Sequence, residues 1–289
     1  MTRILSSLAE ISAGYDALFC DLWGCLHNGK QPYPAAVAAL QAFRAQGGTV
    51  CLMTNAPRPG PYVAAQLDLM GVPRDAWDLI VSSGDAAQDA MFAGAVGRKV
   101  WHIGTAKDDG FFTDIPEAHA GAEPVLRVDL AEAEGIVASG PFDEVSETPE
   151  HYRERFLDAR DRGLPMLCAN PDIIVDLGDV RIYCAGALAE FYESLGGRTL
   201  YFGKPHAPIY DRARQLMGLG PEARYLAVGD GISTDIAGAV AQGVDSIFVT
   251  GGLAADAFGA DIETPDLEML LHWLRVQEKE PTYAIGRLR

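Results

Sequence analysis

The sequence has few cysteines, few basic residues and no long apolar run. Its 289 residues include 5 cysteines and 23 Lys and Arg against 40 Asp and Glu, a net charge of −17. No stretch of about 18 consecutive apolar residues occurs, which excludes a transmembrane helix. A net charge of −17 repels phosphate backbones and anionic lipid heads, so it disfavours nucleic acids and membrane surfaces as partners.

The cysteines do not form the spacing of a disulfide framework or a zinc site. They are Cys20, Cys25, Cys51, Cys168 and Cys184. Their number is odd, no pair has CxxC spacing and all lie in apolar runs, a pattern typical of buried thiols in a reducing compartment. The first residues include Glu10 and lack the apolar stretch of a signal peptide. We therefore expect a cytoplasmic protein.

The residues that are present predict a globular α/β fold. Hydrophobic residues make up 48% of the chain, and short apolar runs alternate with helical patterns. Strands are expected at 17–23, 49–55, 79–83, 99–104, 134–140, 165–170, 180–186, 199–205, 224–230 and 245–251. Helices are expected at 34–47, 61–71, 85–94, 148–163, 187–197, 208–218, 233–242 and within 265–278. Continuous apolar strands alternating with helices indicate a mainly parallel sheet.

Polar residues gather where the expected strands end. They are Asp21, Thr54, Asn55, Ser82, Ser83, Lys204 and Asp230. Because ligands of open α/β sheets bind outside the carboxyl ends of the strands, these residues are candidates for a functional site.

The acidic candidates also have plainer interpretations. Asp21 is either a nucleophile or metal ligand, or a residue that caps a turn at Gly24. Taken alone, the residue favours neither interpretation. Asp235 lies five residues after Asp230, in the first turn of an expected helix, and by itself would stabilise that helix N-terminus. Two carboxylates at one strand–helix junction beside Asp21 suit a hard cation such as Mg²⁺ better.

The other candidates are equally open when taken singly. Lys204, between Gly203 and Pro205, is an ordinary exposed lysine or aims its ammonium group at a phosphoryl group. Thr54 and Asn55 form a turn or helix cap, or they offer a hydroxyl, an amide and backbone N–H groups to phosphate oxygens.

Four segments together resemble the four motifs of the haloacid dehalogenase (HAD) superfamily. In chain order they are CDLWGCL (20–26), LMTNAP (52–57), GKP (203–205) and GDGISTD (229–235). The arrangement is similar to the class IIA, NagD-like subgroup, in which a cap domain of the C2 type is inserted between the second and third motifs. The resemblance implies a Rossmann-like core of residues 1–82 and 185–289 and an inserted α/β cap domain of residues 83–184.

The resemblance implies a role for each motif residue. Asp21 is the expected nucleophile that forms an aspartyl-phosphate. Asp21, the backbone carbonyl of Trp23 and Asp230 are expected to bind Mg²⁺, with Asp235 holding its waters or Lys204.

Substrate contacts follow from the same resemblance. Thr54 is expected to hydrogen-bond the phosphoryl oxygens with Asn55 in support, and Lys204 to neutralise charge on the phosphoryl group. Asn170, with Asp172 and the loop at 176–178, is expected on the substrate-binding rim of the cap.

Trp23 departs from the family pattern, which usually reads Asp-x-Asp at this point. The second Asp acts as general acid and base, a function that an indole cannot perform near neutral pH. Three consequences are open: substrates with good leaving groups, replacement by another residue such as His27, or a protein that binds phospho-ligands in a regulatory role. Dehalogenases also lack this Asp, but they dispense with the metal that Asp230 and Asp235 indicate.

The resemblance thus implies a Mg²⁺-dependent phosphatase acting on a small phosphorylated metabolite. The alternative is a catalytically impaired relative that binds phospho-ligands. Caps of this type often take part in dimers, so a homodimer is an option.

Overall fold

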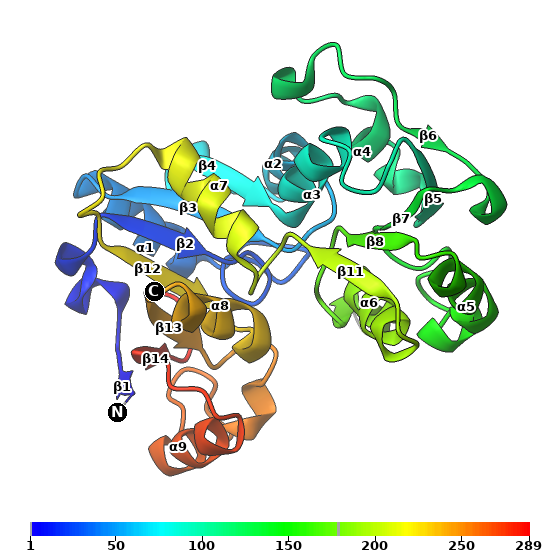
Figure 1. Cartoon of the computed structure of the whole chain (residues 1–289). Coiled ribbons are helices and arrows are strands. Elements are labelled where there is room, and N and C mark those ends of the chain that lie inside the picture. The colour runs from blue at the N-terminus through cyan, green and yellow to red at the C-terminus, as the bar shows by residue number, and fades with distance from the viewer. Residues whose placement is uncertain (1, 178–179) are drawn as a thin grey trace. The chain divides into compact units, whose positions relative to one another are not determined.

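The computed structural model describes residues 2–289 apart from 178–179, and it describes no side chains for 176, 177, 180 and 181. The expected rim loop at 176–178 therefore lies outside the described residues. The chain divides into two compact units (Figure 1). The first comprises Met1–Thr54, Ala64–Val81 and Tyr210–Arg289, and the second Asn55–Val63 and Ser82–Ile209.

A seven-stranded sheet forms the centre of the first unit, in the order β1-β14-β13-β12-β2-β3-β4. Its strands are β1 (Arg3–Ile4), β2 (Ala17–Cys20), β3 (Thr49–Thr54), β4 (Leu79–Ser82), β12 (Tyr225–Gly229), β13 (Asp245–Val249) and β14 (Tyr283–Ile285). Every strand pair of this sheet whose register is described is parallel. The central strand β2 is apolar and buried throughout, as expected for a strand covered on both faces.

The helices follow the strands in the manner of an α/β fold. They are α1 (Pro34–Ala45), α2 (Gly60–Leu69), α7 (Ala207–Met217), α8 (Ala237–Ala241) and α9 (Leu267–Val276), and a π-helical turn at Ile232–Ile236 precedes α8. Pro34 starts α1, where its missing N–H costs no hydrogen bond.

The second unit has its own five-stranded parallel sheet, in the order β11-β8-β7-β5-β6. Its strands are β5 (Lys99–Ile103), β6 (Leu126–Arg127), β7 (Gly135–Ala138), β8 (Pro165–Cys168) and β11 (Arg198–Tyr201). Its helices are α3 (Ser83–Phe92), α4 (Gly110–Thr113), α5 (Arg153–Asp161) and α6 (Ala185–Ser194). A separate antiparallel hairpin joins β9 (Ile174–Leu177) to β10 (Val180–Tyr183).

The mainly parallel α/β fold expected from the sequence is confirmed, and the extent of the second unit differs from the expected insert. The insert was expected to end at residue 184, whereas the second unit continues to Ile209. The physical reason is that β11 pairs with β8, with Arg198 opposite Pro165, so α6 and β11 complete the second sheet. The expected strand at 180–186 is the second arm of the hairpin.

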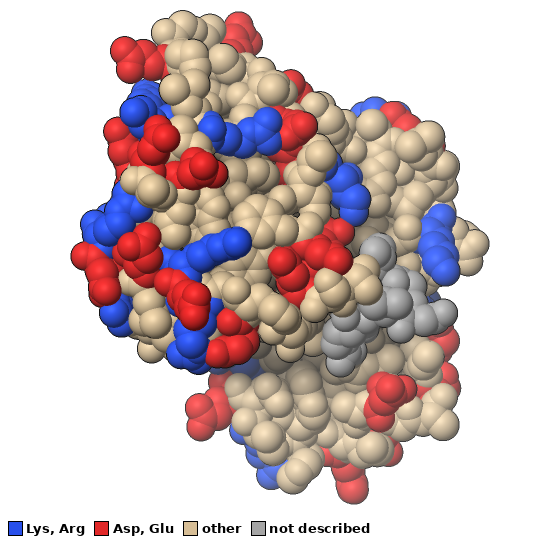
Figure 2. All heavy atoms as spheres, turned by 90° about the vertical axis from the view of Figure 1, so that its right-hand side faces the viewer, with Lys and Arg blue, Asp and Glu red and all other residues tan. Residues whose placement is uncertain are grey.

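Charged side chains of both signs share the face of the second unit in Figure 2. Lys and Arg lie among Asp and Glu over the part of this face that is described. Within the second unit, Lys107 Nζ forms a salt bridge with Glu144 Oε2 at 2.8 Å. Among the described residues, no helix combines the length and the apolar character needed to cross a bilayer.

Candidate functional site

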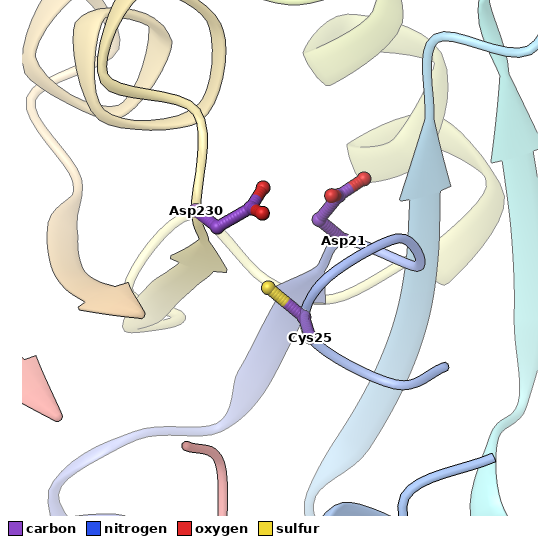
Figure 3. A group of neighbouring side chains, drawn as sticks. All are labelled: Asp21, Cys25 and Asp230. Atoms are coloured by element: carbon purple, nitrogen blue, oxygen red, sulfur yellow. The ribbon is translucent and has the colours of Figure 1, made fainter. Parts of the chain in front are cut away.

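Two carboxylates lie at the carboxyl ends of the neighbouring strands β2 and β12. Asp21 follows β2, and its backbone N–H donates to the carbonyl of Val228 at 2.8 Å, which extends the parallel ladder by one step. Asp230 follows β12, and the two aspartates are 8% and 5% exposed. One carboxylate oxygen of each lies within 4.8 Å of the other and of the Cys25 sulfur (Figure 3). Because burying two like charges is costly, this arrangement favours a bound cation.

Glycines surround the carboxylate of Asp230. Gly24 has a φ of +72°, and a Cβ on it would lie 2.0 Å from Asp230 Oδ2. A Cβ on Gly252, in the loop after β13, would also lie 2.0 Å from that oxygen. The next residue, Leu253, donates its backbone N–H to Asp230 Oδ2 at 2.9 Å. The backbone at Gly24 and at Gly252 thus lies so close to the Asp230 carboxylate that only glycine fits at either position.

Asp235 lies in the π-helical turn after β12 and closes the same loop. Its Oδ2 accepts the backbone N–H of Gly231 at 3.1 Å, and it is 5% exposed. A Cβ on Gly229 would lie 2.1 Å from the Asp235 side chain, so this glycine admits the carboxylate against β12. π-helical turns are rare and occur mostly at functional sites.

Trp23 forms part of a tight loop between β2 and α1. Its ring packs over Gly29, where a Cβ would lie 2.4 Å from two ring atoms, and meets the His27 ring edge-to-face at 5.4 Å. His27 is 1% exposed, and its Nδ1 accepts the backbone N–H of Gly29 at 3.0 Å. Burial lowers the pKa of His27 to about 4. A neutral, buried imidazole with one nitrogen already engaged does not suit the role of general acid near neutral pH.

Thr54 ends β3, the neighbour of β2 on its other side, and is 4% exposed. Its position places it at the same edge of the first unit's sheet as Asp21, Asp230 and Asp235.

Asn55 and Lys204 are joined within the second unit. The Asn55 side chain accepts the backbone N–H of Lys204 at 2.7 Å and donates to the Lys204 carbonyl at 3.0 Å. It also donates to Asp172 Oδ1 at 2.8 Å. Lys204 is 3% exposed, so it is not the ordinary surface lysine that the sequence left open.

Asn170 lies in the loop after β8, close to this group. It is 9% exposed, and its Oδ1 accepts the backbone N–H of Asp172 at 3.0 Å, an Asx turn that shapes the loop. Ser83, the first residue of α3, is fully buried, and a Cβ on Gly203 would lie 2.6 Å from its hydroxyl.

Cys25 and Gly252 are residues of this region that sequence reasoning did not select. Cys25 was read only as a buried thiol, because nothing in its local pattern shows that it faces Asp230. Burial and the neighbouring Asp230 and Asp21 raise the pKa of Cys25 well above its ordinary value, so the thiol is neutral. Two consecutive glycines at 251–252, directly after an apolar strand, were the sequence signal for the loop that approaches Asp230.

The donor set at the end of β2 and β12 fits a hard divalent cation. The two carboxylates supply oxygen ligands of the kind that Mg²⁺ and Ca²⁺ prefer. A neutral thiol beside them is a poor ligand for these ions.

Family comparisons agree with this geometry. Residues 18–115 match a model described as haloacid dehalogenase-like hydrolase, and residues 201–269 match one described as HAD-hydrolase-like. A solved hydrolase of the haloacid dehalogenase-like family from Brucella suis is 40% identical, with a TM-score of 0.83, and the match covers 99% of this chain and 100% of that one. The chain therefore belongs to the haloacid dehalogenase-like hydrolases.

Two of the matching proteins are named as phosphatases. D-glycerol 3-phosphate phosphatase of Mycobacterium tuberculosis is 26% identical over 251 residues, which are 85% of this chain and 66% of that protein's length. A structure of glycerol phosphate phosphatase from the same organism, in complex with magnesium, is 25% identical with a TM-score of 0.64. That match covers 87% of this chain and 73% of the other.

Proposed function

We propose that this protein is a Mg²⁺-dependent phosphatase of the class IIA type that hydrolyses a small organic phosphate through Asp21. The observation that carries the proposal is the pair of buried carboxylates, Asp21 and Asp230, within 4.8 Å of each other at adjacent strand ends. The relatives named as phosphatases support an active enzyme over a regulatory binding protein. The second unit is proposed as the cap.

Asp21 is the proposed nucleophile. A carboxylate oxygen of Asp21 attacks phosphorus, and the bond from phosphorus to the leaving oxygen breaks. Water then attacks the aspartyl-phosphate, which releases inorganic phosphate and restores the carboxylate. Asp21, Asp230 and the backbone carbonyl of Trp23 would hold Mg²⁺, and Asp235 would orient its water ligands. When bound, the ion supplies charge neutralisation for the phosphoryl oxygens.

The remaining motif residues are proposed to bind and stabilise the phosphoryl group. Thr54 donates its hydroxyl to a phosphoryl oxygen, and Lys204 supplies a positive charge. Asn55 holds the Lys204 backbone through the two hydrogen bonds described above. Such positioning and charge stabilisation account for most of the catalysis of phosphoryl transfer.

The leaving group needs a proton, and neither Trp23 nor His27 can supply it. Trp23 has no exchangeable acid near neutral pH, and His27 is buried and neutral. We therefore propose that a water molecule protonates the leaving oxygen and that substrates with acidic leaving groups react fastest.

The test is Asp21→Asn, with p-nitrophenyl phosphate and acetyl phosphate as substrates and Mg²⁺ present. We expect kcat to fall by about 10³-fold or more because the nucleophile is lost. A labelled substrate should also leave phosphate on the wild-type protein and none on the variant. Turnover by Asp21→Asn at the wild-type rate, or no turnover by the wild type, would contradict the proposal.

A further inference from the structure

A concavity lies at the amino-terminal edge of the first unit's sheet, opposite the edge that carries Asp21 and Asp230. Its volume is about 800 Å³, within the range of pockets that hold small organic molecules. Tyr225, Asp245 and Tyr283, the first residues of β12, β13 and β14, line it. All of its lining residues belong to the first unit.

The concavity is distinct from the proposed active site. The strands β2 and β12 have four and five residues, so they are about 13–17 Å long. Both strands begin beside the concavity and end at the buried aspartates. A molecule bound in the concavity would therefore occupy a second site, on the other side of the sheet's central strands from Asp21 and Asp230.

Tyrosine rings form much of the wall. Tyr15, Tyr225 and Tyr283 line the concavity and are half-buried. The Tyr225 ring stacks on Phe19 with the ring centroids 5.0 Å apart. The rings of Tyr15 and Tyr283 stack on no other aromatic ring among the described residues, and their hydroxyls lie 3.4 Å apart. Such ring faces bind planar molecules by stacking.

The polar groups that remain unused in this wall are donors. Arg214 Nη1 donates to Gln242 Oε1 at 2.7 Å. The other N–H groups of this guanidinium and the Gln242 amide N–H groups make no hydrogen bond with any residue that the structure describes. The Arg214 guanidinium lies 5.5 Å from the centroid of the Tyr225 ring, which holds it beside the tyrosines. The wall thus offers hydrogen bonds to an acceptor.

The acidic groups of the wall already have donors. Asp245 accepts the hydroxyls of Tyr15 and Thr282 at 2.7 and 2.9 Å. Glu10 accepts a guanidinium N–H of Arg3 at 2.6 Å. These two carboxylates, together with the net charge of −17, disfavour an anion in the concavity. The occupant that fits is a neutral molecule with acceptor atoms.

We propose that this concavity binds a neutral planar heterocycle with acceptor atoms on one edge, the chemistry of a 6-oxopurine nucleoside. The ring stacks against Tyr15 and Tyr283. The O6 and N7 atoms of its edge accept hydrogen bonds from Arg214, a two-point contact that a planar guanidinium forms readily with such an edge. Because a nucleoside carries no phosphate, this site does not depend on the proposed function.

The test is calorimetric titration with inosine, a 6-oxopurine nucleoside, and with nebularine, which lacks the 6-oxygen. We expect the wild type to bind inosine about tenfold more tightly, because nebularine loses a hydrogen bond to a charged donor. In Arg214→Lys this ratio should fall towards one, since an ammonium group cannot form the two-point contact. Arg74→Lys is the matched control. Arg74 also lies over an aromatic ring and beside an aspartate of the first unit, but outside the concavity.

Gly14→Leu tests the position of the site without changing a polar group. Gly14 lines the concavity, its φ is not positive, and a Cβ on it would meet no atom within 4 Å. A leucine side chain there should fill part of the concavity, so we expect the Kd of inosine to rise about tenfold or more. Gly14→Ala, which adds one methyl group, should change it little.

Three results would overturn the inference. They are no binding of inosine by the wild type at millimolar concentration, an inosine-to-nebularine ratio that is the same in Arg214→Lys as in the wild type, and inosine binding that survives Gly14→Leu. The first and third remain decisive if Arg214→Lys fails to fold. None of them requires turnover of a phosphate ester, so a failure of the proposed function is seen separately.

Discussion

At the scale of single residues, Trp23 is the position at which a substitution should change the proposed activity most. The family resemblance implies an acid–base aspartate at this position, and the Trp23 ring packs on Gly29 and His27. Only its backbone carbonyl is proposed to bind the metal, so the side chain can change without loss of that ligand.

We expect Trp23→Asp to raise kcat for alkyl phosphates by roughly 10²-fold, because a carboxylic acid can protonate the leaving alkoxide. The gain should be smaller for p-nitrophenyl phosphate, whose leaving group needs no proton. Steady-state kinetics with ribose 5-phosphate and p-nitrophenyl phosphate measure the difference. Trp23→Phe is the control for the lost indole; an equal gain in that variant would show that space, not acidity, limits the enzyme.

His102 should make the stability of the protein depend on pH. Burial, with a further contribution from Arg127, lowers the pKa of His102 from 6.5 to about 4, although Asp109 opposes the shift. As pH falls from 6.5 to 4, the unfolded chain takes up the proton before the folded one, so the free energy of unfolding decreases. Below about 4 both states are protonated, and the contribution stays constant.

Through His102, the free energy of unfolding of the wild type should fall by on the order of 2 kcal/mol between pH 7 and pH 4.5. We expect His102→Gln to lack this decrease. Urea unfolding of both proteins at several pH values measures it. Comparison of the variant with the wild type isolates His102 from Asp108, whose raised pKa acts in the opposite direction. Parallel pH profiles for the two proteins would contradict the assignment.

At the scale of elements, the loops after parallel strands place the site. Asp21 and Asp230 follow β2 and β12, and the loop after β13 closes on Asp230 through Gly252 and Leu253. The backbone of this loop holds the carboxylate in place, as supporting residues hold metal ligands in other proteins.

Gly252→Ala should therefore weaken metal binding. The added Cβ would lie 2.0 Å from Asp230 Oδ2, so the carboxylate must move. We expect the Mg²⁺ concentration for half-maximal activity to rise about tenfold or more. Gly220→Ala is the control, since nothing lies within 4 Å of its added Cβ. If both variants need the same Mg²⁺ concentration, the loop after β13 does not support metal binding.

The elements of the second unit could be predicted less well than those of the first. The expected strand at 199–205 was assigned to the core, whereas β11 is an edge strand of the second sheet beside β8. Strand pairing between residues more than 30 positions apart leaves no local pattern in the sequence. The first strand of the hairpin, β9, was missed because its last residues, 176 and 177, were expected to belong to a loop.

At the scale of the whole molecule, both units are built around buried apolar strands, and the cysteines belong to these cores. All five are buried, and none of them forms a disulfide. Burial raises the pKa of Cys168 and Cys184 above the ordinary value, as it does for Cys25. Since thiolates are the reactive form, the folded protein should resist thiol reagents.

We expect no rapid reaction of the native protein with Ellman's reagent at pH 8, and five thiols per chain after unfolding in guanidinium chloride. Absorbance of the released thiolate counts them. Rapid labelling of a cysteine in the native state would show that part of a core opens readily, and mass spectrometry of the labelled peptide would identify it.

The sequence by itself determined the α/β class, the order of the four motifs and the strand ends that carry Asp21, Thr54 and Asp230. These features are local: apolar runs specify buried parallel strands, and a polar residue directly after such a run must lie at the carboxyl edge. Tertiary structure alone decided that α6 and β11 complete the second sheet, that Cys25 and Gly252 approach Asp230, and that Ser139 bonds Asp108. Each of these depends on which strands become neighbours, and that is settled by packing between segments far apart in the chain.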